Sequence, residues 1–471
     1  MNHSVARRDA KAMTRPIIVV AIARAASLTF SVVLLAVLGR RLGPAGFGHL
    51  QLAIAVMAYP TLLVDLGLTT FGLRELARGA SPDVIRVVLG ARIALAGVVT
   101  AAIVIVAVLA GPADPVTSVY LVLALGLPAS ALNARWVLQG EHRFGRAALL
   151  DIATAAMQLG IAALLVRDPD DTPVAALSMT VGAWVMAMVS LVVAGPVSRF
   201  RPRLRPGVAA TIARSFPLGA AGIAITIYYS IGTVLLGVIR GAEDVAFYAA
   251  AYRIIVPVTG LAAAVGTVAI AVLSSLQARD PRAADRAAVD LARRLVLVSL
   301  PVAVGGTLAA EPIIQLVYGP TFTEAIAPFR ILVWSVATVY LNAAFAFLLL
   351  ARGGDRAYLG ATAVGALVNV SLNLIVIPIA GPVGTAAVTI VSELVVLSLL
   401  LWFTRDVATK GVALALQTAG PPTIAMAIVV WFIRDSMAVL PIGALVYGVV
   451  AVLTGAISID ELLQRSEREG A

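Results

Sequence analysis

The sequence predicts an all-α protein that crosses a membrane many times. Of its 471 residues, 61% are hydrophobic and 13% are charged, whereas about a quarter of the residues of an ordinary soluble domain carry a charge. The charged residues lie mainly between apolar stretches. Each stretch reaches the length of about 20 residues that a helix needs to span a bilayer. These observations argue against a water-soluble enzyme and predict a polytopic membrane protein.

Fourteen apolar stretches, taken in chain order, are the predicted transmembrane helices. The first is too long for a cleavable signal peptide. It follows four basic residues, Arg7, Arg8, Lys11 and Arg15, which favour a cytoplasmic N-terminus. The predicted spans cover about residues 16–39, 48–71, 84–110, 116–138, 145–166, 173–195, 212–238, 245–276, 289–309, 327–350, 357–379, 382–404, 412–433 and 439–459.

The distribution of basic residues gives the predicted orientation. With the N-terminus in the cytoplasm, 26 of the 35 Lys and Arg residues fall in cytoplasmic segments and six fall in outer loops. This asymmetry follows the positive-inside rule, and it accounts for the net charge of +10 without nucleic acid as a partner. We therefore expect a multi-pass protein of the bacterial inner membrane with both termini in the cytoplasm.

The residue content also limits the chemistry that we expect. The chain has no Cys, and its three His residues do not have the spacing of metal ligands. It contains no Walker A sequence, so ATP is not the direct energy source. The longest outer loop, about residues 310–326, carries only Glu311 and Glu324 as acids, which leaves no room for a catalytic domain. We expect a transporter without a cofactor or metal site, rather than an enzyme.

An internal repeat predicts two lobes. Residues 39–50 resemble residues 237–248 without a gap, and each stretch joins the first and second helix of a six-helix set. Because the offset is an even number of helices, the copies have the same orientation in the membrane. The predicted divisions are an N-terminal lobe at 1–197, a basic cytoplasmic linker at 198–214, a C-terminal lobe at 212–405, and helices 13 and 14 with a cytoplasmic tail at 406–471.

Four stretches in a fixed order carry a resemblance to a known family. They are Leu38–Leu50 with Asp65-Leu-Gly-Leu and Arg74-Glu-Leu-Ala-Arg78, Thr233–Gly237 through Ala250–Ile254, Ala310–Gly319 with Phe329–Leu332, and Val368–Pro378 with Gly381–Ala387. Over about residues 16–405 the chain resembles the Wzx-type oligosaccharide flippases of polysaccharide biosynthesis. These belong to the multidrug/oligosaccharidyl-lipid/polysaccharide exporter superfamily and are related to lipid II flippases.

The resemblance implies a MATE-like fold of two six-helix lobes around a central cavity. It implies alternating access, which moves a polyprenyl-diphosphate-linked oligosaccharide from the cytoplasmic to the outer leaflet for polysaccharide export. The partners that it implies are this lipid, membrane lipids, a proton or a sodium ion, and polysaccharide polymerase machinery. One departure concerns helix 7, where relatives carry an acidic residue and this chain has Ser230-Ile231-Gly232.

Two arginines inside the spans are the candidate binding groups for the diphosphate. Arg24 lies about nine residues into the first span and Arg253 about nine residues into the eighth, and they resemble the cavity-lining cations of lipid II flippases. Arginine binds phosphates through charge-assisted, often bidentate hydrogen bonds. The alternatives are an ion pair of Arg24 with Asp65, and contact of Arg253 with backbone carbonyls or snorkelling to the interface.

Other polar residues inside the spans each have two interpretations. Glu393, about eleven residues into the twelfth span, is the candidate coupling residue, with a packing carboxyl as the alternative. Asn369 and Asn373 share a helix face and contact either the sugar or a neighbouring helix. Tyr252 either stacks on a sugar or lies at the membrane interface. Arg92 is expected to snorkel toward the cytoplasmic face.

Two other functions remain open at this point. A drug or cation antiporter of the same superfamily would prefer acidic groups in its cavity, whereas the candidates here include two arginines. A membrane-bound polysaccharide polymerase would need large outer loops that carry catalytic groups, which the sequence lacks.

Overall fold

The computed structural model describes residues 2–79, 81, 83–110, 115–203, 207–434, 436 and 438–456. Within the helices, the backbone alone is described at residues 2–25, 28, 110, 115–116, 197–198, 221, 224–225, 228–229, 263–264 and 267. The described residues form helices and no strand, which confirms the predicted all-α fold.

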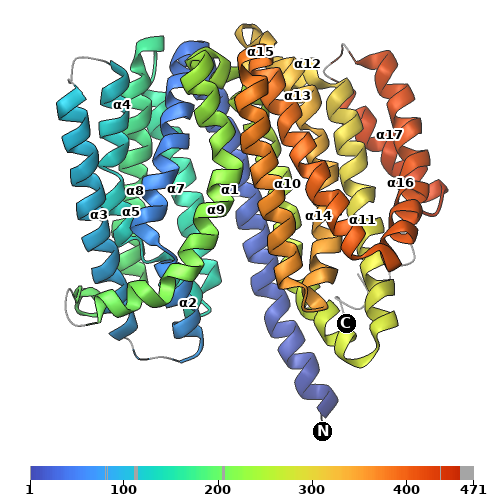
Figure 1. Cartoon of the computed structure of the whole chain (residues 1–471), viewed down its shortest axis with the longest axis horizontal. Helices are drawn as coiled ribbons and strands as arrows, with labels where there is room; N and C mark the ends of the chain where they lie inside the picture. Colours follow the sequence, from blue (N-terminus) through green and yellow to red (C-terminus); the bar gives the residue numbers. More distant parts are fainter. Residues whose placement is uncertain are drawn as a thin grey trace. The chain divides into compact units, whose positions relative to one another are not determined.

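The chain forms two compact units. Unit 1 contains residues 1–237 and 241–246, and unit 2 contains residues 238–240 and 247–471. The helices of unit 1, coloured blue to green in Figure 1, are α1 (Asn2–Asp65), α2 (Leu68–Ala77), α3 (Asp83–Ala110), α4 (Pro115–Ala124), α5 (Leu127–Leu132), α6 (Arg135–Gly140), α7 (Phe144–Leu165), the 3₁₀ turns η1 (Pro169–Asp171) and η2 (Val197–Phe200), α8 (Thr172–Ala194) and most of α9 (Val208–Arg240).

Unit 2 contains the remaining helices, coloured green to red in Figure 1. They are most of α10 (Ala242–Arg279), α11 (Pro281–Leu308), α12 (Ala310–Tyr318), the 3₁₀ helix η3 (Pro320–Ala325), α13 (Ile326–Leu332), α14 (Trp334–Ala351), α15 (Asp355–Phe403), α16 (Arg405–Ile433) and α17 (Val439–Leu453). The units divide between residues 237 and 247, later than the linker that the sequence predicts at 198–214, so the predicted lobe boundaries stay a prediction.

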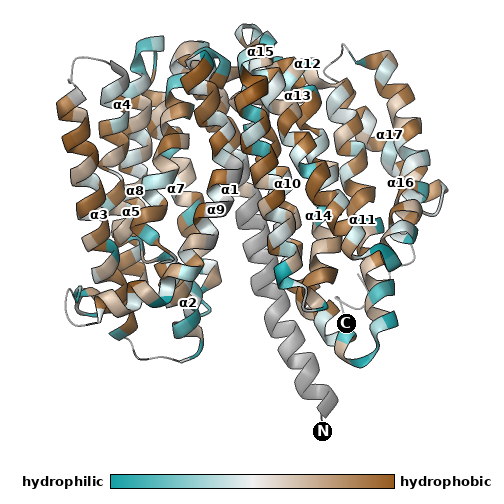
Figure 2. Cartoon of the chain, in the orientation of Figure 1, coloured by the Kyte–Doolittle hydropathy of each residue, from teal (hydrophilic) through white to brown (hydrophobic). Residues whose placement is uncertain are grey.

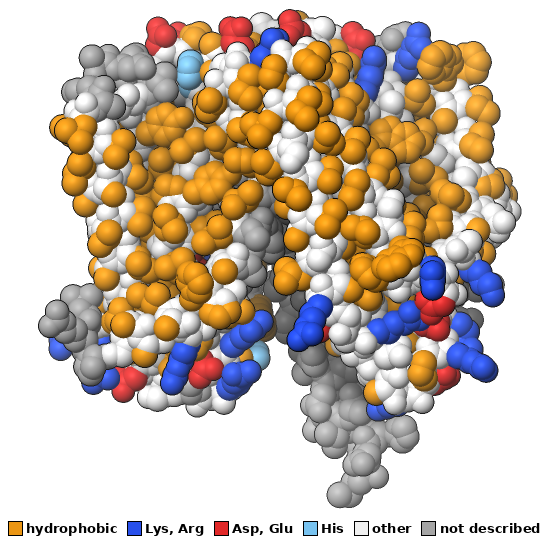
Figure 3. All heavy atoms as spheres, viewed as in Figure 1, with side chains coloured by type: hydrophobic (Ala, Val, Ile, Leu, Met, Phe, Trp, Pro, Cys, Tyr) orange, Lys and Arg blue, Asp and Glu red, His pale blue; other side chains and the backbone are white. Residues whose placement is uncertain are grey.

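Many of the helices are long and apolar enough to cross a membrane. Among the described residues nine helices meet this condition, or ten if the bent pair α11–α12 counts as one span. Figure 2 shows hydrophobic residues along the middle of the helices, and Figure 3 shows hydrophobic side chains over the middle of the visible face of each unit and charged side chains near the helix ends. Phe432 and Leu109 are about 80% exposed, and so much exposed apolar surface fits contact with lipid. The count of fourteen spans stays a prediction.

Two of the longest helical segments contain a sharp break. At Gly43 in α1 the backbone has φ 63° and ψ −178°, and at Gly381 in α15 it has φ 48° and ψ −131°. A straight helix of the 49 residues in α15 would be about 74 Å long, more than twice the thickness of a bilayer core. The breaks therefore divide each segment into two arms, as the predicted spans require.

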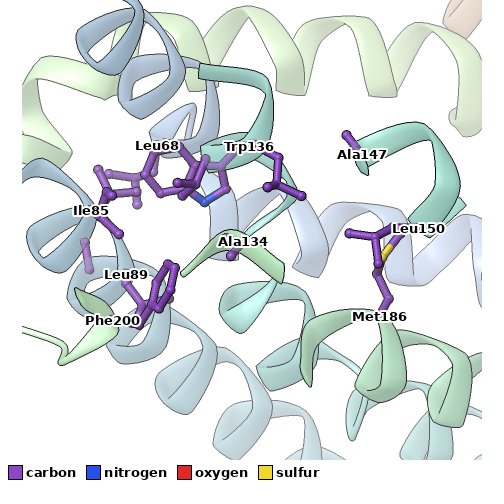
Figure 4. Close-up of a cluster of buried hydrophobic side chains, with 14 residues drawn as sticks. Leu68, Ile85, Leu89, Ala134, Trp136, Ala147, Leu150, Met186 and Phe200 are labelled. Atoms are coloured by element: carbon purple, nitrogen blue, oxygen red, sulfur yellow. The ribbon is translucent and has the colours of Figure 1, made fainter. Parts of the chain in front are cut away.

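The core of unit 1 lies where α2, α3, α6, α7 and α8 meet. Leu68, Ile85 and Trp136 pack in this cluster together with Leu89 and Phe200 (Figure 4), and all five are at least 94% buried. Gly72 on α2 lies against the Trp136 ring, because a Cβ there would come within 2.5 Å of a ring carbon. This contact lets α2 and α6 approach each other closely.

Helices α16 and α17 belong to unit 2 through polar as well as apolar contacts. Pro301 in α11 has no N–H, so the carbonyl of Leu297, four residues earlier, lacks its usual helix donor. The hydroxyl of Tyr447 on α17 donates a hydrogen bond to this carbonyl. A carbonyl freed by proline within a membrane is thus satisfied by a side chain from the neighbouring helix.

A second polar contact joins α11 and α16 at one end of unit 2. The Arg352 guanidinium lies 2.7 Å from a carboxylate oxygen of Asp285 on α11 and 2.7 Å from one of Asp406 on α16. Hydrogen bonds to Asp406, and then to Asp285, raise the pKa of Arg352 above its ordinary value. Because a raised pKa keeps the cation fully charged below the ordinary value, this contact persists throughout the neutral pH range.

Candidate functional site

The predicted site residues fall on three helices. Arg253 and Tyr252 lie on α10, Glu393 and the two asparagines lie on α15, and Asp65 is the last residue of α1. The Arg24 side chain lies outside the described residues, so its predicted roles in substrate binding and in a pair with Asp65 stay predictions.

Arg253 lies in a half-buried position of unit 2 among tyrosines. Its guanidinium is within electrostatic range of the phenols of Tyr252 and Tyr318. The Tyr252 ring stacks on Tyr248 one turn earlier, with centroids 5.8 Å apart and an interplanar angle of 12°. The structure thus brings together a cation and aromatic faces, groups that suit a phosphate and a sugar ring.

Tyr318 comes from a segment that the sequence predicts to be an outer loop. The segment instead folds as α12 and η3, and α12 is bent by 78° from α11. Ala310, Ile314 and Tyr318 follow one another at four-residue spacing and are buried, whereas Glu311 is exposed. This spacing is that of a helix face, and it is the sequence signal that could have found Tyr318.

Glu393 is buried beside an amide from the next helix. Its side chain is 5% exposed, and its Oε2 accepts a hydrogen bond of 2.7 Å from Nδ2 of Asn342 on α14. The Oδ1 of Asn342 is also buried, without a hydrogen-bond partner among the described residues. From its place inside an apolar span, Asn342 is expected to form either an interhelical hydrogen bond or a sugar contact. The packing of α14 on α15 gives it an interhelical bond, to Glu393.

Asn369 and Asn373 bond to each other rather than to a neighbouring helix. Nδ2 of Asn373 donates to the side-chain oxygen of Asn369 at 3.0 Å and to its backbone carbonyl at 2.9 Å. Both residues are buried, at 4% and 0% exposure. They share a face of α15 as predicted, and their contact with a sugar stays a prediction.

Asp65 in unit 1 forms an ion pair with Arg92. The Nε of Arg92 lies 3.5 Å from Oδ1 of Asp65, and the same oxygen accepts hydrogen bonds from the backbone N–H and the hydroxyl of Thr69. The expectation that Arg92 snorkels outward is wrong: Arg92 is 6% exposed. Pairing with a carboxylate lowers the cost of burying both charges.

Arg92 also satisfies the end of a broken helix. The predicted fourth span, 116–138, is divided into α4, α5 and α6. The two terminal nitrogens of Arg92 donate to the carbonyls of Ser130, at 2.6 Å, and Asn133, at 3.2 Å, where α5 ends. Backbone groups left free by a break within a membrane need such donors, which explains why the cation turns inward.

Unit 2 contains an apolar cavity of about 490 Å³. Its wall comes from α10, α11, α12, α13, α14, α16 and α17, and its side chains are apolar except for Tyr447. Ile254 and Ile255 line it and directly follow Arg253 in the chain. Val298, Val302 and Leu440 line it as well and are 36% to 54% exposed, so the cavity reaches the surface of the unit.

Metal-ligating residues do not gather at any of these places. Within the part of the chain that the structure describes, no three His, Cys, Asp or Glu residues lie close enough to hold a metal ion.

Spanning helices, buried charges and a helix broken inside a predicted span are features of polytopic membrane proteins, transporters among them. The sequence profile described as "Polysaccharide biosynthesis protein" matches residues 13–277. Because this match covers more than half of the chain, the protein belongs to that family. No curated protein matches the chain.

Solved structures of the exporter superfamily have the same fold. The lipid II flippase MurJ in its inward closed conformation superposes with a TM-score of 0.78 at 15% identity, covering 95% of this chain and 100% of MurJ. An inward-facing MATE family multidrug transporter has a TM-score of 0.62 at 16% identity, over 83% of this chain and 98% of that one. An outward-facing structure gives 0.56 at 18% identity, over 84% and 96%. These similarities confirm the predicted MATE-like fold.

Proposed function

We propose that this protein moves a polyprenyl-diphosphate-linked oligosaccharide from the cytoplasmic to the outer leaflet by alternating access of two lobes. The observation that carries the proposal is that the helix α10, which carries Arg253, also lines the apolar cavity of unit 2. Arg253 offers a cation, and Ile254 and Ile255, which follow it on α10, line the cavity. A cation and the wall of an apolar cavity on the same helix suit a lipid with an anionic head.

The dimensions and chemistry of the cavity support an isoprenoid ligand. Its volume of about 490 Å³ lies within the range of roughly 300–1,000 Å³ of ligand sites. Its lining offers almost no polar group, so it would bind a hydrocarbon chain rather than a sugar. Arg24 stays part of the proposal as a second cation for the diphosphate. The Arg253 cation argues against a cationic drug as the substrate.

Translocation in vesicles tests the proposal. We would reconstitute the full-length protein with a polyprenyl-diphosphate disaccharide that carries a fluorophore, and quench the outer leaflet with membrane-impermeant dithionite. Protein-containing vesicles should lose nearly all fluorescence, whereas protein-free vesicles should keep the inner-leaflet half. Arg253→Ala should slow the loss at least tenfold, because a hydrogen bond to a charged group contributes about 1.5–3 kcal/mol. Arg24→Ala should act in the same direction.

A matched variant controls for a general effect of losing an arginine. Arg330 lies on α13 of the same unit, and its side chain is exposed, so Arg330→Ala should leave the rate unchanged. The proposal fails if protein-containing and protein-free vesicles behave alike, or if Arg253→Ala and Arg330→Ala have equal effects. Uptake of a cationic dye in place of the lipid would instead identify a drug transporter.

A further inference from the structure

Unit 2 holds a carboxyl group where membrane helices rarely carry one. Glu393 lies twelve residues after the break at Gly381 and ten before the end of α15 at Phe403. We propose that Glu393 and Asn342 form a proton-binding site, and that the bound proton couples to the occupancy of Arg253.

The first step of the argument is burial. Glu393 is 5% exposed and Asn342 is 8% exposed, so an ionised carboxylate here would give up nearly all of its hydration. Such a transfer costs several kcal/mol unless hydrogen bonds compensate for it. The bond of 2.7 Å from Nδ2 of Asn342 supplies one donor. The pair can therefore hold the carboxyl in either protonation state.

The second step is the acceptor that the pair leaves unused. The Oδ1 of Asn342 is buried and has no hydrogen-bond partner among the described residues. A carboxylate offers only acceptors and cannot satisfy it, whereas a carboxylic acid has an O–H that can. A proton taken from water adds to one Glu393 oxygen, and no other bond changes. The protonated acid can then face the amide with a donor and an acceptor, which matches the donor and acceptor of Asn342.

The ionisable residues around the pair lie mainly on helices other than α14 and the second arm of α15. Apart from Glu393, the arm of α15 from 382 to 403 has no ionisable residue, and α14 has only Tyr340, whose hydroxyl donates to the carbonyl of Val258. Of the other helices that contact α15, α10 carries Tyr248, Tyr252 and Arg253 near Thr389. Helix α13 carries Arg330, which is exposed, and α16 carries Arg405, Asp406 and Lys410 in its first two turns. Glu393 is thus the acid of this arm of α15, and Asn342 is its hydrogen-bond partner on α14.

The third step connects the pair to the candidate substrate group, and it rests on the proposed function. Thr389 lies one turn before Glu393 on α15, and its hydroxyl is 3.2 Å from the hydroxyl of Tyr248 on α10. Tyr248 stacks on Tyr252, which adjoins Arg253. A change of charge at Glu393 therefore acts next to the helix face that presents Arg253, and a ligand at Arg253 would in turn change proton binding.

Infrared spectroscopy of the full-length protein in lipid nanodiscs tests the proton site without any transport. The wild type should show a carbonyl band of a buried, protonated carboxylic acid that disappears as the pH is raised. Glu393→Gln should lack this band. Glu311→Gln is the matched control, because Glu311 is an exposed acid of the same unit, and it should keep the band. A difference spectrum between wild type and E393Q without such a band at any pH would overturn the proposal.

Two further measurements separate the possible failures. Glu393→Asp keeps a carboxyl at this position on a side chain that is shorter by one methylene, so the titrating band should be present. If the band is absent although the variant elutes and melts like the wild type, the band does not belong to this position. In the vesicle assay, a pH gradient should change the wild-type rate severalfold and leave E393Q unaffected. If the band titrates but the pH gradient does not change the rate, the proton site is supported and its coupling to transport is rejected. Absence of any translocation would reject the proposed function alone.

Discussion

Arg92 is held by three groups at once, which come from two separate parts of unit 1. The Asp65 carboxylate ends the second arm of α1, and the carbonyls of Ser130 and Asn133 end α5. A guanidinium has five N–H donors spread over a rigid plane, so a single Arg side chain can bridge a carboxylate and two carbonyls that lie on different sides of it. At the scale of the residue, a buried cation is stable here because the carboxylate at the end of α1 balances its charge and the carbonyls at the end of α5 accept its hydrogen bonds.

Removal of the charge of Asp65 should therefore be costly. Asp65→Asn keeps the shape of the side chain but leaves Arg92 as a buried charge without its counterion, which should lower the free energy of unfolding by about 3 kcal/mol. The measurement is the melting temperature of the purified protein in detergent. Asp83→Asn is the control, because Asp83 pairs with Arg86 and Arg203 at an exposed position, where such pairs contribute less than about 1 kcal/mol. Equal shifts for the two variants would contradict this account.

At the scale of the element, the irregular positions of the helices determine their neighbours. Gly43 and Gly241, which the predicted repeat aligns, have the same unusual backbone, with φ of 63° and 97° and ψ of −178° in both. This region is accessible essentially to glycine alone. Pro301 acts differently, because it frees a carbonyl that a side chain of another helix then binds. Helix α17 is thus joined to α11 by a hydrogen bond to a carbonyl that Pro301 leaves without its helix donor.

This interpretation predicts a coupled pair of variants. Tyr447→Phe should lower the free energy of unfolding by about 1 kcal/mol, since it leaves the Leu297 carbonyl without a donor. In a Pro301→Ala background the backbone N–H of residue 301 can supply the missing bond, so Tyr447→Phe should then cost much less. A double-mutant cycle by thermal unfolding measures this coupling. Costs that add in the double variant would show that Tyr447 acts through packing alone.

At the scale of the whole molecule, apolar exposure and basic residues together determine orientation. The charged side chains of each unit lie near the helix ends, and the middle of each visible face is hydrophobic (Figure 3). The excess of Arg in alternate loops predicts which ends face the cytoplasm. Because the chain has no Cys, single cysteines can report on this orientation without interference.

Cysteine labelling in whole cells is the corresponding experiment. Arg201→Cys, in the predicted cytoplasmic segment, should resist a membrane-impermeant thiol reagent until the cells are broken. Glu324→Cys, on η3 in the predicted outer segment, should react at once. Both positions are exposed in the structure, so access rather than burial decides the result. Rapid reaction at position 201 would reverse the predicted topology.

The sequence determined the class, the fold family and the family membership of this protein. The length and apolarity of the stretches predict transmembrane helices, because backbone groups in hydrocarbon must form their hydrogen bonds within their own segment. The ordered motifs around Gly43 and Asp65, and those after residue 233, carried the resemblance that the profile match confirms.

Tertiary structure alone decided which polar groups meet. Pattern and spacing show that Arg92, Asp65, Glu393 and Asn342 lie inside apolar segments, but hydrogen bonds and ion pairs act only over a few ångströms. Their partners are 27 to 51 positions away in the chain, and packing of separate helices brings them together. The same reason explains the failed expectation for Arg92: a single sequence shows how long its side chain is, whereas the fold shows that a carboxylate and two free carbonyls lie within its reach.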